Sequence, residues 1–145
     1  MPRTRWTFAF PAQLSEEADG RYTVTFPDVP EAITFGGDRE AALANAVDAL
    51  NTALAEYARR GLAAPHPSRA GRGQAMIAAD PVIALKLALA QAMREQGTRK
   101  AALARRLGTD EKEVRRLLDP AHASKARRLA EALRALGHSV EVAVS

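Results

Sequence analysis

Three basic residues near the C-terminal end of the chain have the types and spacing that suit contact with a polyanion. Lys112, Arg115 and Arg116 stand at positions i, i+3 and i+4, so they share one face of a predicted helix. The opposite face carries the apolar residues Val114, Leu117 and Leu118. A short helix with a buried apolar stripe and a basic outer face can enter the DNA major groove and read base edges.

The residues before this helix predict a partner helix and a tight turn. Apolar residues at helical spacing precede Gly108, which ends the first helix. Asp110 then begins the second helix, and Asp110 with Glu113 has the form of a capping box. The predicted pair is a helix-turn-helix over residues 97–118, and its DNA-binding candidates are Arg99, Lys100, Glu111, Lys112, Arg115 and Arg116.

These candidates divide by role. Arg99 and Lys100 begin the first helix, where they can meet phosphate oxygens. Lys112 and Arg116 are the candidates for base edges, and Arg115 for base or backbone. The carboxylate of Glu111, at the start of the second helix, can accept a hydrogen bond from a cytosine amino group. Stabilising the helix dipole is an equally good interpretation of this residue.

The remainder of the C-terminal half predicts a helical domain. Helices are expected over residues 83–96 and 124–136, which with the pair above make a four-helix set. Residues 140–144 alternate as a short C-terminal strand. A strand in a helical domain needs a partner for its ladder, and a second copy of the chain would supply one in a homodimer. The other reading is that this strand pairs with the N-terminal sheet of its own chain.

The N-terminal half predicts a small sheet with one helix. Period-two alternation predicts strands at residues 6–10, 21–26 and 33–35, a helix follows over 39–60, and a strand at 74–79 follows a Pro- and Gly-rich loop. The order is βββαβ, so the fold class is α+β, with an N-terminal domain at 1–80 and a helical domain at 81–145.

Charge and composition differ between these halves. Residues 1–80 carry a net charge of −2 and residues 81–145 a net charge of +6, which suggests partners of two kinds. The chain has no cysteine, and its first residues lack the apolar run of a signal peptide. We therefore expect a cytoplasmic protein without a membrane segment.

Residues for catalysis are missing from the sequence. The three histidines have no metal-ligand spacing, and no nucleophile elbow, P-loop or dinucleotide fingerprint occurs. The predicted N-terminal strands carry no acidic residue except Asp28 at a strand end, which is too few for a two-metal nuclease. We expect no catalytic residue, no metal site and no cofactor.

The ordered set of segments resembles the HicB antitoxins of bacterial type II toxin–antitoxin systems, in the form with a C-terminal helix-turn-helix. The segments that carry the resemblance are residues 22–30 (YTVTFPDVP), 33–36, 40–50 and 65–68, together with Lys86, 103–108 and 116–120. The resemblance implies a partial RNase-H-like N-terminal domain without catalytic acids. It also implies that this domain neutralises a small HicA-type mRNA-cleaving toxin, while the C-terminal domain binds operator DNA and represses the operon.

The candidates for toxin contact directly follow the predicted strand at residues 21–26. Pro27, Asp28, Pro30 and Glu31 lie at an exposed strand end and are our candidates, although the prolines can merely shape a turn. An acidic N-terminal half fits a toxin that binds RNA with a basic face. The alternatives are a stand-alone helix-turn-helix regulator, which would need a ligand pocket in its N-terminal domain, and an RNase-H-like nuclease, which would need strand carboxylates.

Overall fold

The computed structural model describes residues 5–145, which divide into two compact units. Residues up to Glu56 together with Pro65–Asp80 form the first unit, and Tyr57–Ala64 together with Pro81–Ser145 form the second. The end of the long helix therefore groups with the C-terminal residues, which a single boundary after residue 80 does not anticipate.

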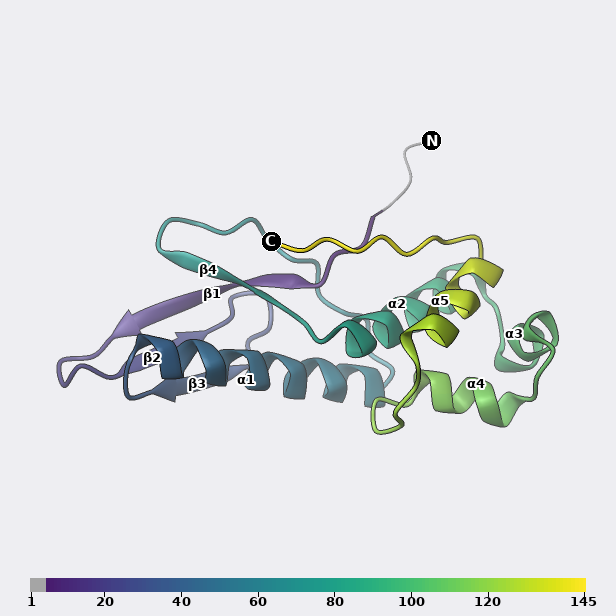
Figure 1. Ribbon diagram of the computed structural model, residues 1–145, viewed down its shortest axis with the longest axis horizontal. Helices are drawn as coiled ribbons and strands as arrows, with labels where there is room; N and C mark the ends of the chain where they lie inside the picture. The colour runs from purple at the N-terminus through teal and green to yellow at the C-terminus, as the bar shows by residue number, and fades with distance from the viewer. Residues whose placement is uncertain (1–4) are drawn as a thin grey trace. The chain divides into compact units, whose positions relative to one another are not determined.

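The first unit is a four-stranded antiparallel sheet with one long helix (Figure 1). Its elements are β1 (Ala9–Glu16), β2 (Tyr22–Thr25), β3 (Ile33–Gly36), α1 (Arg39–Arg59) and β4 (Gln74–Ala78). The strands lie in the order β3-β2-β1-β4, so the first three form a meander and β4 returns beside β1. This is the βββαβ order that the sequence predicts.

The first strand starts later and runs further than the predicted residues 6–10. Residues 9–13 of β1 pair with β4, and residues 13–16 pair with β2. The strand is long because it has two partners in succession, whereas its alternation in the sequence is interrupted by Pro11. The hairpin turn is correspondingly short, and the main-chain N–H of Glu17 donates to the carbonyl of Arg21 at 2.7 Å.

Pro11 lies inside β1 without disrupting the sheet. The main-chain N–H of Ala79 donates to the carbonyl of Phe8 at 2.8 Å, so the alternation of the strand turns the main-chain groups of Pro11 away from β4. On that side, the pairing with β2 begins only at Gln13, which lies opposite Thr25. The proline nitrogen therefore stands where no ladder hydrogen bond is required.

One face of the sheet packs against α1. Gly36, at the end of β3, lies so close to this helix that a β-carbon there would overlap the main chain of Ala42. The buried side chains of this face and of α1 form the core of the unit: Phe10, Ala12, Val24, Ala46, Leu50 and Leu54. At the β3 edge, Ile33 and Phe35 remain 63% and 62% exposed.

The second unit is a set of four helices. They are α2 (Pro81–Gln96), α3 (Lys100–Leu107), α4 (Glu111–Leu118) and α5 (Ala126–Ala135). Each helix contributes a fully buried leucine to the core, namely Leu89, Leu103, Leu117 and Leu129. The burial of these side chains is the main stabilising contribution to a unit of this kind. The four-helix prediction agrees with this arrangement.

The predicted boundary of the last helix is displaced at its start. We expected residues 124–136, but α5 begins at Ala126, and Lys125 occupies the N-cap position without a side-chain cap bond. Ser124 is a good N-cap residue by type. Its hydroxyl is engaged elsewhere, since it donates to the carbonyl of Arg116 at 3.3 Å and accepts from Lys86 at 2.7 Å.

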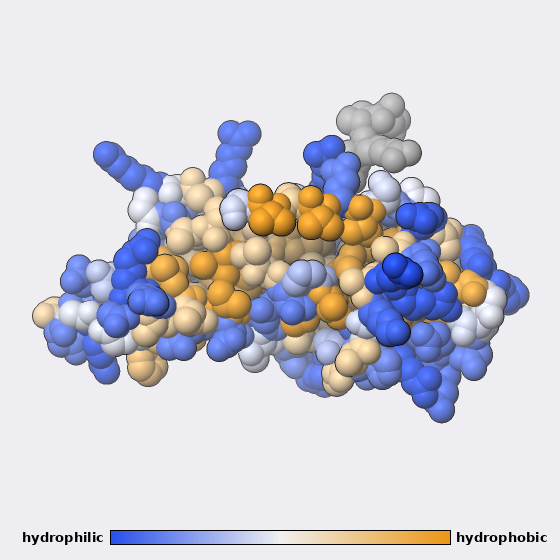
Figure 2. Space-filling view, in the orientation of Figure 1, coloured by the Kyte–Doolittle hydropathy of each residue, from blue (hydrophilic) through white to orange (hydrophobic). Residues whose placement is uncertain are grey.

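The C-terminal strand predicted at residues 140–144 is absent, so the prediction is wrong for the single chain. The four strands of the described sheet leave these residues out, including the alternative in which they return to it. Val142 and Val144 are 86% and 92% exposed, and hydrophobic side chains follow one another along this segment (Figure 2). A strand exists only where a neighbour accepts its main-chain hydrogen bonds.

Candidate nucleic-acid and protein interfaces

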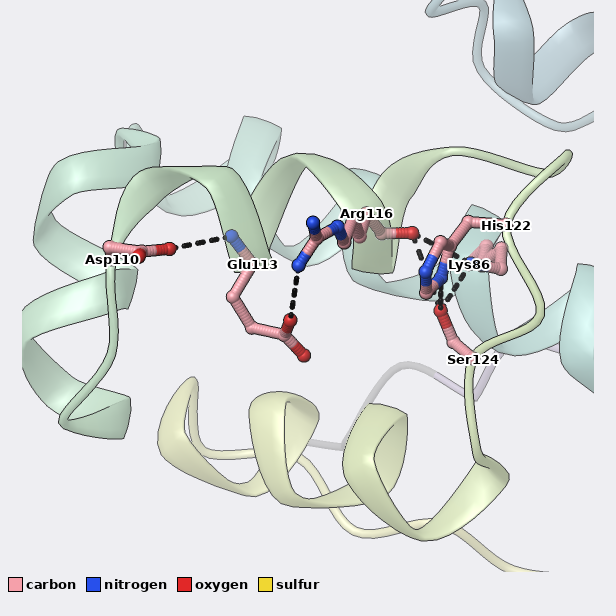
Figure 3. Close-up of polar contacts among 6 residues, drawn as sticks. All are labelled: Lys86, Asp110, Glu113, Arg116, His122 and Ser124. Carbon is pink, nitrogen blue, oxygen red and sulfur yellow. Dashed lines mark hydrogen bonds and ion pairs between the residues drawn. The ribbon is translucent and has the colours of Figure 1, made fainter.

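The turn between α3 and α4 is closed at both ends by hydrogen bonds. Gly108 adopts a left-handed conformation with φ of +66°, and its N–H donates to the carbonyl of Arg105. The N–H of Thr109 donates to the carbonyl of Ala104 at 2.9 Å, which completes a Schellman motif. The side chain of Asp110 then accepts from the N–H of Glu113 at 2.9 Å and caps α4 (Figure 3). These bonds fix the angle between the two helices.

The capping box is only half formed. Asp110 makes the predicted bond, but the Glu113 carboxylate lies 3.8 Å from the guanidinium of Arg116, with which it forms an ion pair along α4. A second ion pair joins Glu111 to Arg115 at 3.6 Å. Both pairs are substantially exposed, so each stabilises the helix by at most about 1 kcal/mol. An incoming phosphate or base edge can therefore replace them at small cost.

Burial in α4 follows the predicted faces. Val114 and Leu117 are buried, and Leu118 is partly buried. Lys112, Arg115 and Arg116 are exposed. Within residues 5–145 the ammonium group of Lys112 has neither a hydrogen bond nor an ion pair, so it is available to an external anion.

The two basic residues at the start of α3 are also exposed. Arg99 holds the N-cap position but makes no side-chain cap bond, and Lys100 is the first helical residue. Cations at a helix N-terminus do not gain from the helix dipole. The free N–H groups there, together with two cationic side chains, can instead bind an anion such as a phosphate.

Lys86 is a functional candidate that the residue pattern alone did not single out. It lies in the apolar stripe of α2 and is only 1% exposed. Its ammonium group donates to the carbonyls of Arg116 at 3.0 Å and Leu117 at 3.2 Å, and to the hydroxyl of Ser124 at 2.7 Å (Figure 3). The sequence signal for this residue is a lysine inside the otherwise apolar run of residues 85–90, LKLALA.

The position of Lys86 has an electrostatic consequence. Burial lowers the pKa of its ammonium group from the ordinary value of 10.5, while the carboxylates of Asp119 and Glu113 act in the opposite direction. The cation also meets the last carbonyls of α4, where the helix dipole favours positive charge. Lys86 thus connects α2 to the C-terminal end of α4 and to the segment before α5.

The four toxin-contact candidates lie in a compact turn after β2. The N–H of Val29 donates to the carbonyl of Phe26 at 3.0 Å, and the Val29 side chain is buried. Exposed side chains in this turn are Pro27, Pro30 and Glu31. The structure therefore brings the four candidates together, and the prolines also shape the turn.

Asp28 has a structural partner far along the chain. Its two carboxylate oxygens accept from the N–H and from the hydroxyl of Ser68, each at 2.7 Å. Charge-assisted hydrogen bonds of this kind are stronger than neutral ones. Asp28 therefore holds the long loop between α1 and β4 against the turn, a role that the sequence did not reveal.

The described residues offer no sign of a metal centre. Among residues 5–145, no group of three or more His, Cys, Asp or Glu side chains is arranged to hold a metal ion. The described β-strands contain a single carboxylate, Glu16 at the end of β1. In the same residues, no helix is both long and apolar enough to cross a membrane.

A family profile and individual relatives of known name all indicate the same protein family. Residues 9–88 match the sequence profile of a family described as HicB-like antitoxin of bacterial toxin–antitoxin system. The chain is 39% identical over 133 residues to Antitoxin HicB 2 of Photorhabdus laumondii, which covers 92% of this chain and 94% of the relative. It is 32% identical over 133 residues to Antitoxin HicB of Escherichia coli strain K12, covering 92% and 96%.

A third relative extends this similarity. Antitoxin HicB of Pseudomonas fluorescens is 33% identical over 138 residues, which covers 94% of each chain. The family profile ends at residue 88, within α2, whereas the pairwise similarities cover more than nine-tenths of the chain. The relatives therefore share the second unit as well as the first.

Proposed function

Because this chain belongs to the HicB-like antitoxin family and is an antitoxin of a bacterial toxin–antitoxin system, we propose that it neutralises a HicA-type mRNA-cleaving toxin and represses its own operon. The observation that carries the proposal is the similarity to curated antitoxins over both units. Toxin binding is assigned to the first unit and promoter binding to the second, and both partners belong to the cytoplasm.

In the second unit, α3 and α4 act as a helix-turn-helix and α4 as the recognition helix. Lys112 and Arg116 contact base edges, Arg115 contacts a base or the backbone, and Arg99 and Lys100 contact phosphates. The exposure of all these side chains and the closed turn at Gly108 support this assignment. On DNA, Arg116 exchanges its ion pair with Glu113 for a contact with the nucleic acid.

In the first unit, a partial RNase-H-like fold binds the toxin without catalysing a reaction. A two-metal nuclease needs several carboxylates that converge on metals about 4 Å apart. The described strands contain one carboxylate, Glu16, and we propose binding as the role of this unit. The candidate contacts remain Pro27, Asp28, Pro30 and Glu31, with Asp28 also holding Ser68.

Dimer formation through the C-terminal residues completes the proposal. A single recognition helix reads few base pairs, so repressors of this kind bind as dimers to two half-sites. Residues 140–144 present exposed valines and belong to none of the strands of the described sheet. Pairing with the same segment of a second copy would supply the ladder. Deletion of residues 140–145 should then halve the mass in solution, and an unchanged mass would contradict this step.

Two assays on the purified chain test the proposal directly. In the first, the chain is added to the small protein from the adjacent reading frame, and cleavage of an RNA substrate should stop at a stoichiometric ratio. In the second, the chain should retard a fragment of its own promoter but not an unrelated fragment of equal length. Continued RNA cleavage would refute the antitoxin mechanism, and equal retardation of both fragments would refute specific repression.

A further inference from the structure

The outer side of β4 presents main-chain groups without a hydrogen-bonding partner. This strand lies at one edge of the sheet and pairs only with β1. At its end, the N–H of Ala79 donates to the carbonyl of Phe8. Because main-chain groups alternate in direction along an antiparallel strand, those of Met76 and Ala78 point away from β1. In the part of the chain that the structure describes, these groups of Met76 and Ala78 make no hydrogen bond, so they can bind a further strand.

Side-chain burial along β4 agrees with an open edge. Ile77 lies opposite the buried Phe10 of β1 and is itself only 8% exposed, so it belongs to the core. Met76 and Ala78 point to the other face of the sheet and are exposed, Met76 to 48%. A large apolar side chain thus stands in the middle of the open edge, where a partner strand would cover it.

The opposite edge of the sheet is less accessible to a new strand. At β3 the carbonyl of Phe35 accepts from the side-chain amide of Asn45 at 2.8 Å, and a pairing strand would have to displace that bond. Natural edge strands are commonly protected by charged side chains or proline. The sequence of β4, QAMIA, contains neither. Strand addition is therefore better supported at β4 than at β3.

The free edge of β4 is complementary to a second copy of itself. A two-fold axis at Met76 sets the strands antiparallel, so the two copies of Met76 exchange reciprocal main-chain hydrogen bonds and Gln74 lies opposite Ala78. The N–H of Gln74 is already used, because it donates to the carbonyl of Gly71 at 3.2 Å. Its outward carbonyl remains available to the N–H of Ala78 of the second copy. The main-chain donors and acceptors of the two edges therefore match.

Charge favours the same partner and the same direction. Since β4 carries no charge, it offers no attraction to a charged partner, and two copies of it meet without like-charge repulsion. The turn before β4 carries the exposed Arg72. Antiparallel pairing sets the two copies of Arg72 at opposite ends of the paired strands, whereas parallel pairing would set them side by side.

We propose that β4 pairs with β4 of a second copy across a two-fold axis at Met76, which joins two four-stranded sheets into one continuous sheet. The surface belongs to the first unit, whereas the self-pairing proposed at residues 140–144 belongs to the second unit. The inference goes beyond the proposed function, because it holds whether or not residues 140–144 associate. Where both interfaces form and close, the chain is a tetramer.

Charge at the two-fold position tests this surface in the full chain. Met76→Lys and Met76→Glu each place like charges opposite each other, so each should halve the mass found by sedimentation equilibrium. The unfolding midpoint should stay unchanged, because this side chain is exposed and its main-chain groups point away from β1. The matched control is Thr25→Lys, at an exposed residue of β2 on the same face of the sheet, which should leave the mass unchanged.

An equimolar mixture of Met76→Lys and Met76→Glu provides a rescue, because opposite charges then meet across the axis. The mixture should regain the mass of the unaltered chain. The inference is wrong if either variant alone keeps that mass. A halved mass without recovery in the mixture would assign the edge to another occupant, such as residues 140–144 of a neighbouring copy, and would also overturn it. Deletion of residues 140–145 tests the other interface separately, so the two failures are distinguishable.

Discussion

The ammonium nitrogen of Lys86 lies 3.0 Å from the main-chain carbonyl oxygen of Arg116. The same Arg116 is the residue whose guanidinium we assign to a base edge. A cation buried in α2 therefore holds the end of the helix that carries the candidate reading residues. The placement of α4 depends on a polar bond from the core, in addition to the apolar contacts of Val114 and Leu117.

Replacing this lysine should loosen the recognition helix. Lys86→Met keeps most of the length of the side chain but removes the three hydrogen bonds of the ammonium group, to the carbonyls of Arg116 and Leu117 and to the Ser124 hydroxyl, and each such loss costs about 1–3 kcal/mol. We expect the free energy of unfolding to fall by about 2–4 kcal/mol and operator affinity to fall with it. Urea unfolding and fluorescence anisotropy measure the two effects. The control Lys125→Met, at an exposed lysine, should change neither.

The stability of the chain should also depend on pH through Lys86. Its pKa in the folded chain is lowered by burial, whereas in the unfolded chain it returns to 10.5, so between these values the unfolded state binds more protons. The contribution of Lys86 to the free energy of unfolding therefore rises with pH through that window. The free energy of unfolding of the unaltered chain should therefore increase relative to that of Lys86→Met as the pH rises toward 10.5. Parallel pH profiles would contradict the burial of a charged lysine.

Truncation of Arg116 should act on DNA binding alone. Arg116→Ala removes a candidate base contact that is worth about 1–3 kcal/mol, so affinity for the specific operator should fall by about tenfold or more while the fold is retained. Arg134→Ala, at an exposed arginine of α5, is the matched control. Glu113→Gln should raise the affinity slightly because it releases Arg116 from its ion pair. Wild-type operator affinity in Arg116→Ala would refute the assignment of α4.

The bond between Asp28 and Ser68 allows two roles of Asp28 to be separated. Charge reversal at Asp28 and Glu31 together should weaken toxin binding by about tenfold or more. Ser68→Ala removes one partner of Asp28 but keeps its negative charge, and should leave the affinity within about threefold. Calorimetric titration with the toxin compares the variants. An equal loss in Ser68→Ala would show that Asp28 acts by holding the loop rather than by touching the toxin.

Two neighbouring glycines provide a test of the packing of α1 on the sheet. A β-carbon at Gly36 would overlap the main chain of Ala42, so Gly36→Ala must displace the helix and should cost about 1–3 kcal/mol. A β-carbon at Gly37 would meet nothing within 4 Å, and Gly37→Ala should be nearly neutral. Thermal unfolding distinguishes the two. Equal stability of both variants would show that α1 does not approach the sheet this closely.

The helical unit could be predicted from local signals, since Gly108 and Asp110 mark its central turn by residue type alone. The role of Lys86 could not be predicted in this way, because its three hydrogen-bond acceptors belong to residues 116–124, which only folding brings close to it. The length of β1 depended on the register with two partner strands, which no period-two pattern contains.

At residues 140–144 a clear local pattern predicts a strand that the single chain does not form. The alternation of valines in the sequence is clear, yet a strand also requires a second chain segment to accept its hydrogen bonds. The described sheet provides none. Alternation of this kind therefore predicts a strand only where a second chain segment is available to pair with it.

The most direct test of the central claim is co-purification with the neighbouring gene product. This chain alone is tagged and is expressed together with the short reading frame beside its gene. We predict that the small protein elutes with it in a stoichiometric complex and that its RNA cleavage is silenced in that complex. The account would be contradicted if nothing co-elutes and the neighbouring protein, expressed alone, neither cleaves RNA nor harms the cell.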